Sequence, residues 1–275
     1  MNWPTVSIGI PTWNRTDLVV KAIRSVLVQD YARQVEIVVA DDGSTDGTVQ
    51  TLRRLFGNRI TLAPGEHRGI ANAKNRALIG GTGEVRGILD SDDVYEPQFV
   101  RRCVETLLEE QQKDGLRAGL VYTDNYLMDG KGRVSEIQPA LDWSLEEFLD
   151  TCNLRGDCWL AWWNILQETD LHDERFELEV DYDLFYQMAR ITNFRRVPET
   201  LQRVRSHRGR VTKDWRKAAF WHAVGLGKYG HSMDYAVRRA ARRGTWEEWR
   251  ETILEGYAYG KSLREAPVNT PSFAF

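Results

Sequence analysis

Three carboxylates lie within four positions of the stretch ILDSDDVYEP, residues 88–97. They are Asp90, Asp92 and Asp93, and they follow an apolar run that predicts a buried strand. Carboxylates held this close raise one another's pKa unless a cation or a hydrogen-bond donor lies between them. An oxygen-only cluster suits a hard cation such as Mg²⁺ or Mn²⁺, which binds one or two carboxylates together with phosphates and waters. The spacing favours a metal–phosphate site over a solvated loop.

Asp93 has a simpler explanation than metal binding. A helical pattern begins near Pro97, and an aspartate shortly before a helix commonly caps it. This explanation accounts for Asp93 alone, because a single cap needs neither Asp90 nor Asp92. We therefore expect Asp93 to cap the helix and the other two carboxylates to bind a ligand.

Two further polar stretches follow predicted strands. PTWNR (11–15) follows the apolar run TVSIGI, and DDGSTDGT (41–48) follows VEIVVA. Alternation of such runs with helical patterns predicts an α/β fold with a mostly parallel sheet flanked by helices. Ligands of these sheets bind beyond the carboxyl ends of the strands. We therefore expect the three polar clusters to converge in space.

Together these groups fit a nucleoside diphosphate. A strand-end aspartate can accept a hydrogen bond from a base N–H, and a cation can bridge two phosphates. Taken alone, DDGS is better explained as a turn before the next helix. The sequence contains no GxxxxGK[ST] and no GxGxxG after the first strand, which argues against P-loop phosphoryl transfer and a dinucleotide site. The remaining common use of the diphosphate is as the leaving group of an activated sugar.

The second half of the chain has a different pattern. From about Gly119, the runs GLVYTDNYLM and RVSEIQ, joined by the turn DGKG, predict an antiparallel pair. Residues 144–190 are expected to be helical around the aromatic stretch CWLAWWNI. The chain from about residue 211 is expected to be helical and basic.

The amino-acid composition limits the possible binding partners and the cellular compartment. The chain has 275 residues, of which 42% are hydrophobic, enough for one large domain with an appendage. Its 37 basic and 40 acidic residues do not favour a nucleic-acid partner. Cys103, Cys152 and Cys158 lack metal-site spacing and suggest free thiols in a reducing compartment. No apolar run approaches the roughly 18 residues of a membrane span, so we expect a cytoplasmic protein, soluble or peripheral at the membrane.

The ordered motifs resemble those of the family 2 glycosyltransferases, which have the GT-A fold. The matching stretches are VSIGIPTWNR (6–15), VEIVVADDGSTDGT (35–48), GIANAKNRAL (69–78), ILDSDDVYEP (88–97) and VDYDLFYQMA (180–189). The resemblance implies a Rossmann-like domain over 1–210, with a nucleotide-binding half (1–118) and an acceptor half (119–210). The small antiparallel region belongs to the second half, and residues 211–275 would form a C-terminal helical extension.

The resemblance also implies roles for individual residues. Asp42 would hold the nucleobase, Asp90 would approach the ribose, and Asp92 would ligate Mn²⁺ or Mg²⁺ at the diphosphate. Asp181 would be the catalytic base that removes the proton of the acceptor hydroxyl. The other donor-binding residues would be Pro11, Thr12, Asn14, Arg15, Lys74 and Ser91. Lys74 stands where the family has arginine, which keeps the charge but loses the bidentate geometry.

Several of these assignments have structural alternatives. Asp181 follows Val180 where the family often has Glu-Asp, with Glu179 one residue earlier, and Asp181 could simply be an acidic residue in a first helical turn. His207 would lie near the metal or the diphosphate, or be a solvated loop side chain. The indoles of Trp159 and Trp162 would form an acceptor platform, or pack in the core.

The basic C-terminal helices provide a further potential contact. These helices could contact an anionic membrane surface through four arginines and two nearby tryptophans: Arg238, Arg239, Arg242, Arg243, Trp215 and Trp221. A solvated basic face is the favoured alternative.

We therefore expect an inverting, metal-dependent glycosyltransferase that acts in polysaccharide or glycoconjugate biosynthesis. Its donor would be a nucleotide-diphospho-sugar, with a UDP-sugar favoured over GDP or dTDP donors, and its acceptor would carry a hydroxyl group. A sugar-phosphate nucleotidyltransferase would need a Gly-rich basic loop after the first strand, which PTWNR is not. A non-catalytic nucleotide-sugar-binding module is the second alternative. The sequence predicts neither the sugar, the acceptor nor the oligomeric state.

Overall fold

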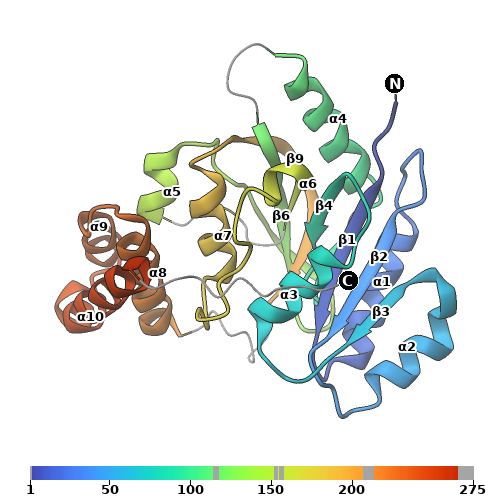
Figure 1. Cartoon of the computed structure of the whole chain (residues 1–275), viewed down its shortest axis with the longest axis horizontal. Helices are drawn as coiled ribbons and strands as arrows, with labels where there is room; N and C mark the ends of the chain where they lie inside the picture. Colours follow the sequence, from blue (N-terminus) through green and yellow to red (C-terminus); the bar gives the residue numbers. More distant parts are fainter. Residues whose placement is uncertain (1, 114–117, 152–153, 155–157, 207–213, 266–275) are drawn as a thin grey trace.

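A computed structural model of the chain describes residues 2–113, 118–151, 154, 158–206 and 214–265. These residues form a nine-stranded sheet with the order β3-β2-β1-β4-β8-β6-β9-β5, in which β7 pairs with β6 (Figure 1). The strands are β1 (Val6–Thr12), β2 (Glu36–Asp41), β3 (Thr61–Pro64), β4 (Val85–Ile88), β5 (Val94–Tyr95), β6 (Ala118–Met128), β7 (Val134–Gln138), β8 (Trp159–Trp162) and β9 (Asn193–Arg205). The helices are α1 (Thr16–Leu27), α2 (Thr48–Phe56), α3 (Ile70–Ile79), α4 (Phe99–Gln111), α5 (Leu145–Thr151), α6 (Trp163–Leu166), α7 (Val180–Met188), α8 (Trp215–Tyr229), α9 (Asp234–Arg242) and α10 (Trp246–Glu265), with a 3₁₀ turn η1 (Gly57–Arg59).

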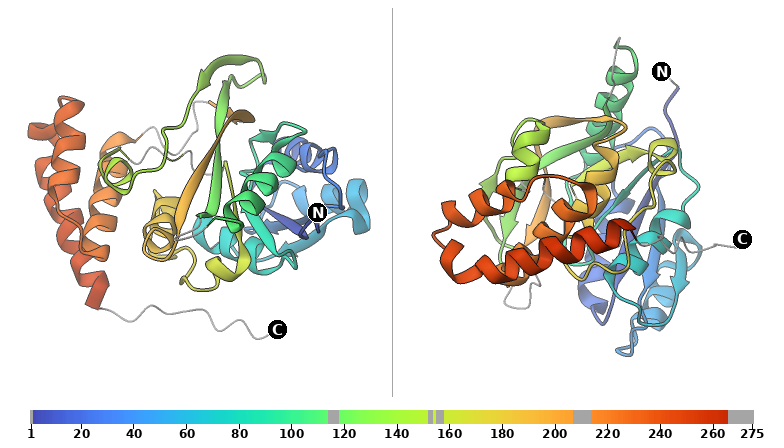
Figure 2. Two further views of the ribbon diagram at one scale, coloured as in Figure 1. Left: turned by 90° about the horizontal axis from the view of Figure 1, so that it is seen from above. Right: turned by 60° about the vertical axis from the view of Figure 1, so that its left-hand side comes forward.

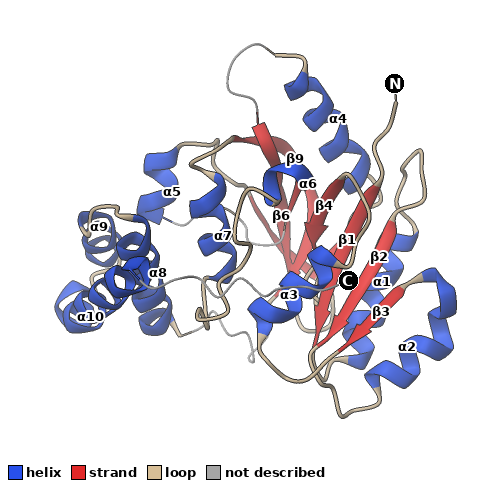
Figure 3. Ribbon diagram, viewed as in Figure 1, coloured by secondary structure: helices blue, strands red, loops and turns tan. Residues whose placement is uncertain are grey.

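The first half of the sheet is parallel. Strand β1 pairs in parallel with β2 and β4, and β2 pairs in parallel with β3. All seven residues of β1 are buried, as expected for a strand that is covered by helices on both faces. The predicted α/β sheet flanked by helices is therefore confirmed (Figure 3).

Two hydrophobic cores lie on opposite faces of this sheet. One core joins Ile8 and Ile10 of β1 to apolar residues of α1, α2 and α4, such as Ile23. The other core joins Leu120 of β6 to apolar residues of α3, α5 and α7, such as Leu184. The sheet and the helices on its two faces thus form three layers, which Figure 2 shows from two further directions.

The strand register brings the polar clusters to one edge. Thr12 at the end of β1 pairs with Asp41 at the end of β2, and the Leu89 N–H after β4 donates to the carbonyl oxygen of Gly9. Gly9 also lets α3 approach closely, because a Cβ at this position would lie 2.8 Å from the Cβ of Ala77. The close approach of α3 brings Lys74 to the same edge.

The second half differs in part from the sequence expectation. The antiparallel pair is confirmed as β6 and β7. The expectation of helices throughout 144–190 is wrong for Trp159–Trp162, because this segment is strand β8 and pairs antiparallel with both β4 and β6. Strand β9, parallel to β6, was not predicted. Short apolar runs fit a buried strand and a buried helix equally well, so periodicity could not identify β8.

The described part of the C-terminal segment, residues 214–265, is mostly helical, as expected. Helices α8, α9 and α10 pack beside α5 and α7, on the side away from the parallel strands (Figures 1 and 2). The basic face is partly neutralised, because Arg238 and Arg242 both contact the carboxylate of Asp150, and Trp221 is buried. Within the described residues, no helix is long and apolar enough to cross a membrane. The domain boundary at residue 210 stays a prediction.

Candidate functional site

The polar clusters of the first two strand ends are joined by hydrogen bonds. The backbone N–H of Asn14 donates to Ser44 Oγ at 2.8 Å, and the N–H of Thr45 donates to Asn14 Oδ1 at 2.8 Å. Asn14 has a positive φ of 50°, a conformation that asparagine tolerates better than most residues. Arg15 then reaches the third cluster, with its Nη1 3.0 Å from Asp92 Oδ2. The expected convergence of the three clusters is confirmed.

Asp42 and Asp41 have different surroundings at the end of β2. The oxygens of Asp42 accept the backbone N–H groups of Arg68 and Gly69 at 2.9 and 3.0 Å, and His67 Nδ1 lies 2.8 Å away. Asp41 Oδ2 accepts from the N–H of Ser44, whereas its buried Oδ1 has no hydrogen-bond partner among the described residues. Asp42 thus anchors the start of α3, and Asp41 keeps a free acceptor.

Thr12 adds a second unpaired group beside Asp41. Its hydroxyl is buried and has no hydrogen-bond partner in the described part of the chain. The two residues are register partners in β1 and β2, so their unpaired oxygens belong to adjacent strand ends. Buried polar atoms without partners are rare and often belong to sites that a ligand completes.

The acidic loop after β4 is held by β9. Asp93 accepts from the backbone N–H of Arg205 at 2.7 Å and from Gln202 Nε2 at 3.2 Å. The guanidinium of Arg205 donates to the carbonyl oxygen of Asp92 at 2.9 Å. The expected helix cap by Asp93 is therefore wrong, since α4 begins at Phe99 without a side-chain cap. Asp93 instead fixes the loop, and sequence alone could not show this because its partners lie more than 100 positions away.

The remaining loop carboxylates are accessible and paired with cations. The side chains of Asp90 and Asp92 are 34% and 12% exposed, and Ser91 between them is buried. Lys74 Nζ lies 3.5 Å from Asp90, and Arg15 pairs with Asp92. Two carboxylates fit a hard cation that takes its other ligands from phosphates and water. The described residues contain no group of three or more His, Cys, Asp or Glu placed to hold a metal by themselves.

Lys74 connects the acidic loop to the predicted base. The Lys74 side chain is only 2% exposed, and its Nζ lies 2.8 and 2.7 Å from the two oxygens of Asp181. Burial alone would raise the pKa of Asp181, but the Lys74 ammonium and the hydrogen bond from His172 together hold that pKa below its usual range. These contacts favour the ionised form of Asp181, which is the form that a proton acceptor needs.

His172 is a site residue that sequence reasoning missed. It lies in the loop before α7, and its Nε2 is 3.3 Å from Asp181 Oδ1. A single histidine in TDLHDERFE gives no periodic or motif signal, so only the folded arrangement shows this contact.

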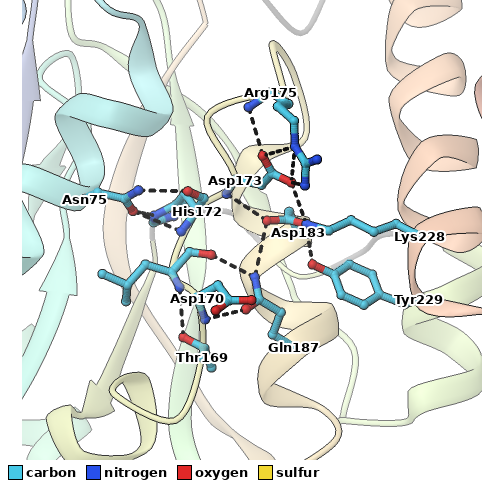
Figure 4. Close-up of polar contacts among 11 residues, drawn as sticks. Asn75, Thr169, Asp170, His172, Asp173, Arg175, Asp183, Gln187, Lys228 and Tyr229 are labelled. Atoms are coloured by element: carbon cyan, nitrogen blue, oxygen red, sulfur yellow. Dashed lines mark hydrogen bonds and ion pairs between the residues drawn. The ribbon is translucent and has the colours of Figure 1, made fainter. Parts of the chain in front are cut away.

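A second charged cluster supports the same loop and helix (Figure 4). Lys228 of α8 places its Nζ 2.8 Å from Asp173 and 2.7 Å from Asp183, and Tyr229 donates to Asp183 at 2.5 Å. Asp173 follows His172, and Asp183 lies on the helix that carries Asp181. Helix α8 thus fixes both sides of the His172–Asp181 contact.

The two tryptophans of the predicted acceptor platform lie in or against the hydrophobic cores. Trp159 is 1% exposed and belongs to the core beneath α5 and α7. Trp162 is partly buried against the other core and pairs with Val85 at the start of β4, the end opposite the acidic loop. The burial of Trp159 leaves no exposed ring face for an acceptor and favours the core-packing alternative. The acceptor role of Trp162 stays a prediction. His207 lies outside the described residues.

Comparison with known proteins identifies the family. A model of "Glycosyl transferase family 2" matches residues 7–126. The chain is 31% identical over 196 residues to a chondroitin synthase of Pasteurella multocida, covering 70% of this chain and 20% of that protein. The chain therefore spans about a fifth of the length of that relative.

Solved structures share the fold. The S. aureus protein TarS, solved in complex with UDP-GlcNAc, superposes with a TM-score of 0.68 at 16% identity, covering 94% of this chain and 83% of that chain. A mannosyltransferase from Pyrobaculum calidifontis, in complex with GDP-Man and Mn²⁺, gives 0.57 at 17% identity, covering 94% and 74%. The fold is thus a GT-A type α/β fold. The chain belongs to the family 2 glycosyltransferases.

Proposed function

We propose that the protein is an inverting glycosyltransferase that moves a sugar from a nucleotide-diphospho-sugar to a hydroxyl acceptor. The observation that carries this proposal is the position of Lys74, whose ammonium lies between Asp90 of the acidic loop and the ionised Asp181. One ammonium group therefore contacts both a carboxylate of the proposed donor site and the carboxylate proposed to accept the proton. Donors of the UDP and GDP type, and a role in polysaccharide or glycoconjugate synthesis, are supported by the ligands and names of the relatives.

The transfer is a single displacement. The acceptor oxygen attacks the anomeric carbon as the bond to the diphosphate breaks, and Asp181 takes the acceptor proton. Arg15 and Lys74 offer positive charge where the diphosphate gathers negative charge. A Mn²⁺ or Mg²⁺ ion held by Asp92, when bound, would neutralise further charge on the leaving group. One displacement inverts the anomeric centre once.

The nucleobase lies at the end of β2 in this proposal. The family resemblance assigns it to Asp42, whereas the unpaired oxygen of Asp41, beside that of Thr12, favours Asp41 as the acceptor. An aspartate acceptor selects bases with an imide or lactam N–H, which are uracil, thymine and guanine. The UDP-GlcNAc and GDP-Man of the two structural neighbours both carry such bases.

A thermal-shift panel tests the proposed function and the identity of the nucleobase. Nucleoside diphosphates of uracil, thymine or guanine, with Mn²⁺, should raise the Tm more than those of cytosine or adenine, because a ligand that binds only the native state stabilises it. Asp41→Asn should weaken the preferred ligand more than Asp42→Asn if Asp41 is the acceptor. Stronger stabilisation by cytidine or adenosine diphosphate would contradict an aspartate acceptor.

Asp92→Ala tests the metal ligand. It should remove the Mn²⁺-dependent gain in nucleoside diphosphate affinity, by about tenfold or more, since even residues that merely orient metal ligands contribute on this scale. Titration calorimetry with and without Mn²⁺ measures this gain. Asp30→Ala, which removes an exposed carboxylate paired with Arg101, is the matched control and should leave the gain unchanged. An equal Mn²⁺ effect in wild type and Asp92→Ala would reject the assignment.

A further inference from the structure

His172 contacts the proposed base and is buried with it. Its side chain is 0% exposed. The ring lies between two elements, with Nδ1 2.9 Å from Asn75 Oδ1 of α3 and Nε2 3.3 Å from Asp181 Oδ1 of α7. Both ring nitrogens therefore face oxygen atoms.

The hydrogen bonds of Asn75 fix one proton of this ring. Asn75 Nδ2 donates to the carbonyl oxygen of His172 at 2.8 Å, and the backbone N–H of His172 donates to Asn75 Oδ1 at 2.9 Å. These two bonds identify which amide atom is the oxygen. Because an amide oxygen can only accept, the Nδ1 atom that faces it carries a hydrogen.

The second ring nitrogen faces a carboxylate. An ionised carboxylate also only accepts, so a hydrogen bond across this 3.3 Å contact requires one hydrogen between His172 Nε2 and Asp181 Oδ1. Either an imidazolium donates to a carboxylate, or a neutral imidazole accepts from a protonated Asp181. The Lys74 ammonium, 2.7 Å from Asp181 Oδ2, favours the ionised carboxylate. The hydrogen therefore belongs to His172.

We propose that His172 is a positioning residue that holds Asp181 ionised and oriented through Oδ1, so that Oδ2, which also accepts from Lys74, takes the acceptor proton. This role rests on the proposed function of Asp181. In the step, the acceptor O–H bond breaks and its hydrogen passes to Oδ2. The O–H electron pair forms the bond to the anomeric carbon, and the pair of the old bond leaves with the diphosphate. His172 neither gains nor loses a proton.

Lys74 alone does not supply this function. Its ammonium is shared with Asp90 at 3.5 Å, on the side where the donor diphosphate is expected. A bound diphosphate therefore competes with Asp181 for the same cation. Among the described residues, His172 has no such competitor, since its other nitrogen is held by Asn75.

The protonation of His172 can be measured without an assay of transferase activity. In ¹⁵N-histidine NMR spectra of the free protein at neutral pH, both ring nitrogens of His172 should be protonated, with the signal assigned through His172→Gln. In Asp181→Asn, His172 should carry a proton on Nδ1 only, because the carboxylate charge is gone. A neutral His172 in the wild type would overturn the proposal, even if transfer activity is established. Absence of transfer would defeat the proposed function and leave this measurement valid.

Kinetics of two variants test the positioning role. His172→Phe should lower kcat about tenfold or more, the scale of a misplaced catalytic group, with nucleoside diphosphate affinity within about threefold of wild type. The low-pH limb of the kcat–pH profile of this variant should move to higher pH. Without the hydrogen bond from His172, less opposes the effect of burial, which raises the pKa of Asp181. His172→Gln keeps one hydrogen-bond donor in its side-chain amide. It should recover part of kcat, but the low-pH limb of its kcat–pH profile should stay displaced from that of the wild type.

A second buried histidine provides the control. His222 of α8 is buried, and its Nε2 contacts the Leu149 carbonyl oxygen at 2.9 Å. His222→Gln should therefore leave kcat and the low-pH limb unchanged. Wild-type kcat and pH dependence in both His172 variants would overturn the proposal. If His172→Phe does not fold, His172→Gln and the NMR spectra decide.

Discussion

Asp181→Asn is expected to lower the transfer rate about 100-fold or more, the usual scale for a general base. The asparagine preserves the shape of the side chain but cannot take the acceptor proton. Because the carboxylate acts only as the glycosidic bond forms, its contribution belongs to the transition state and not to donor affinity. The affinity of the variant for the metal–donor complex should therefore stay within a few-fold of wild type. Calorimetry measures this affinity, and a transfer assay measures kcat.

A neighbouring carboxylate provides the matched control for this variant. Asp170 lies in the same loop as His172 and is exposed. Asp170→Asn should leave turnover within about twofold, as expected for a surface change. Near-normal turnover in Asp181→Asn would remove Asp181 as the base. Asp183 could not replace it, because its carboxylate is fully buried against Lys228 and Tyr229.

Lys228→Met is expected to lower the free energy of unfolding by about 3–5 kcal/mol, the cost of removing one partner of a buried ion pair. Lys228 is 8% exposed, and the side chains of its partners Asp173 and Asp183 are 5% and 0% exposed. Without the ammonium, Asp183 keeps only neutral hydrogen-bond donors and Asp173 keeps Arg175. Urea denaturation measures the loss.

The loss should depend on pH. Burial opposes ionisation of Asp173, but hydrogen bonds from Arg175 and Lys228 lower its pKa from 3.8 to about 2. This depressed pKa contributes stability that is present above about pH 4 and is lost as the pH falls toward 2. The difference between wild type and Lys228→Met should therefore narrow below pH 4. Lys217→Met, which removes an exposed pair with Glu177, should change stability little at any pH, and an equal loss in both variants would contradict the account.

The nucleotide-binding half could be predicted because its signals are local. Each polar cluster directly follows its own apolar run, and parallel strands present their carboxyl ends at one edge. This rule therefore predicts that the clusters containing Arg15, Asp42 and Asp92 meet. Asp93 was misread because a local cap explained it, whereas its partners on β9 are distant in sequence.

The other side of the site could not be predicted from local patterns. His172 reaches Asp181 only because Asn75, 97 positions earlier, holds its ring and backbone. Lys228 lies in an expected helix, but nothing in the helical pattern indicates that its ammonium is buried between two aspartates. The burial of Trp159 could not be predicted, because a run of tryptophans does not show which faces a sheet will cover.

The most direct test of the central claim follows one reaction by ¹H NMR. The protein is incubated with Mn²⁺, the nucleotide-sugar that stabilises it most, and a panel of hydroxyl acceptors. The account predicts release of the nucleoside diphosphate with a transferred sugar of inverted anomeric configuration, and about 100-fold less product with Asp181→Asn. Retained configuration in the product, or equal product from Asp181→Asn, would contradict it.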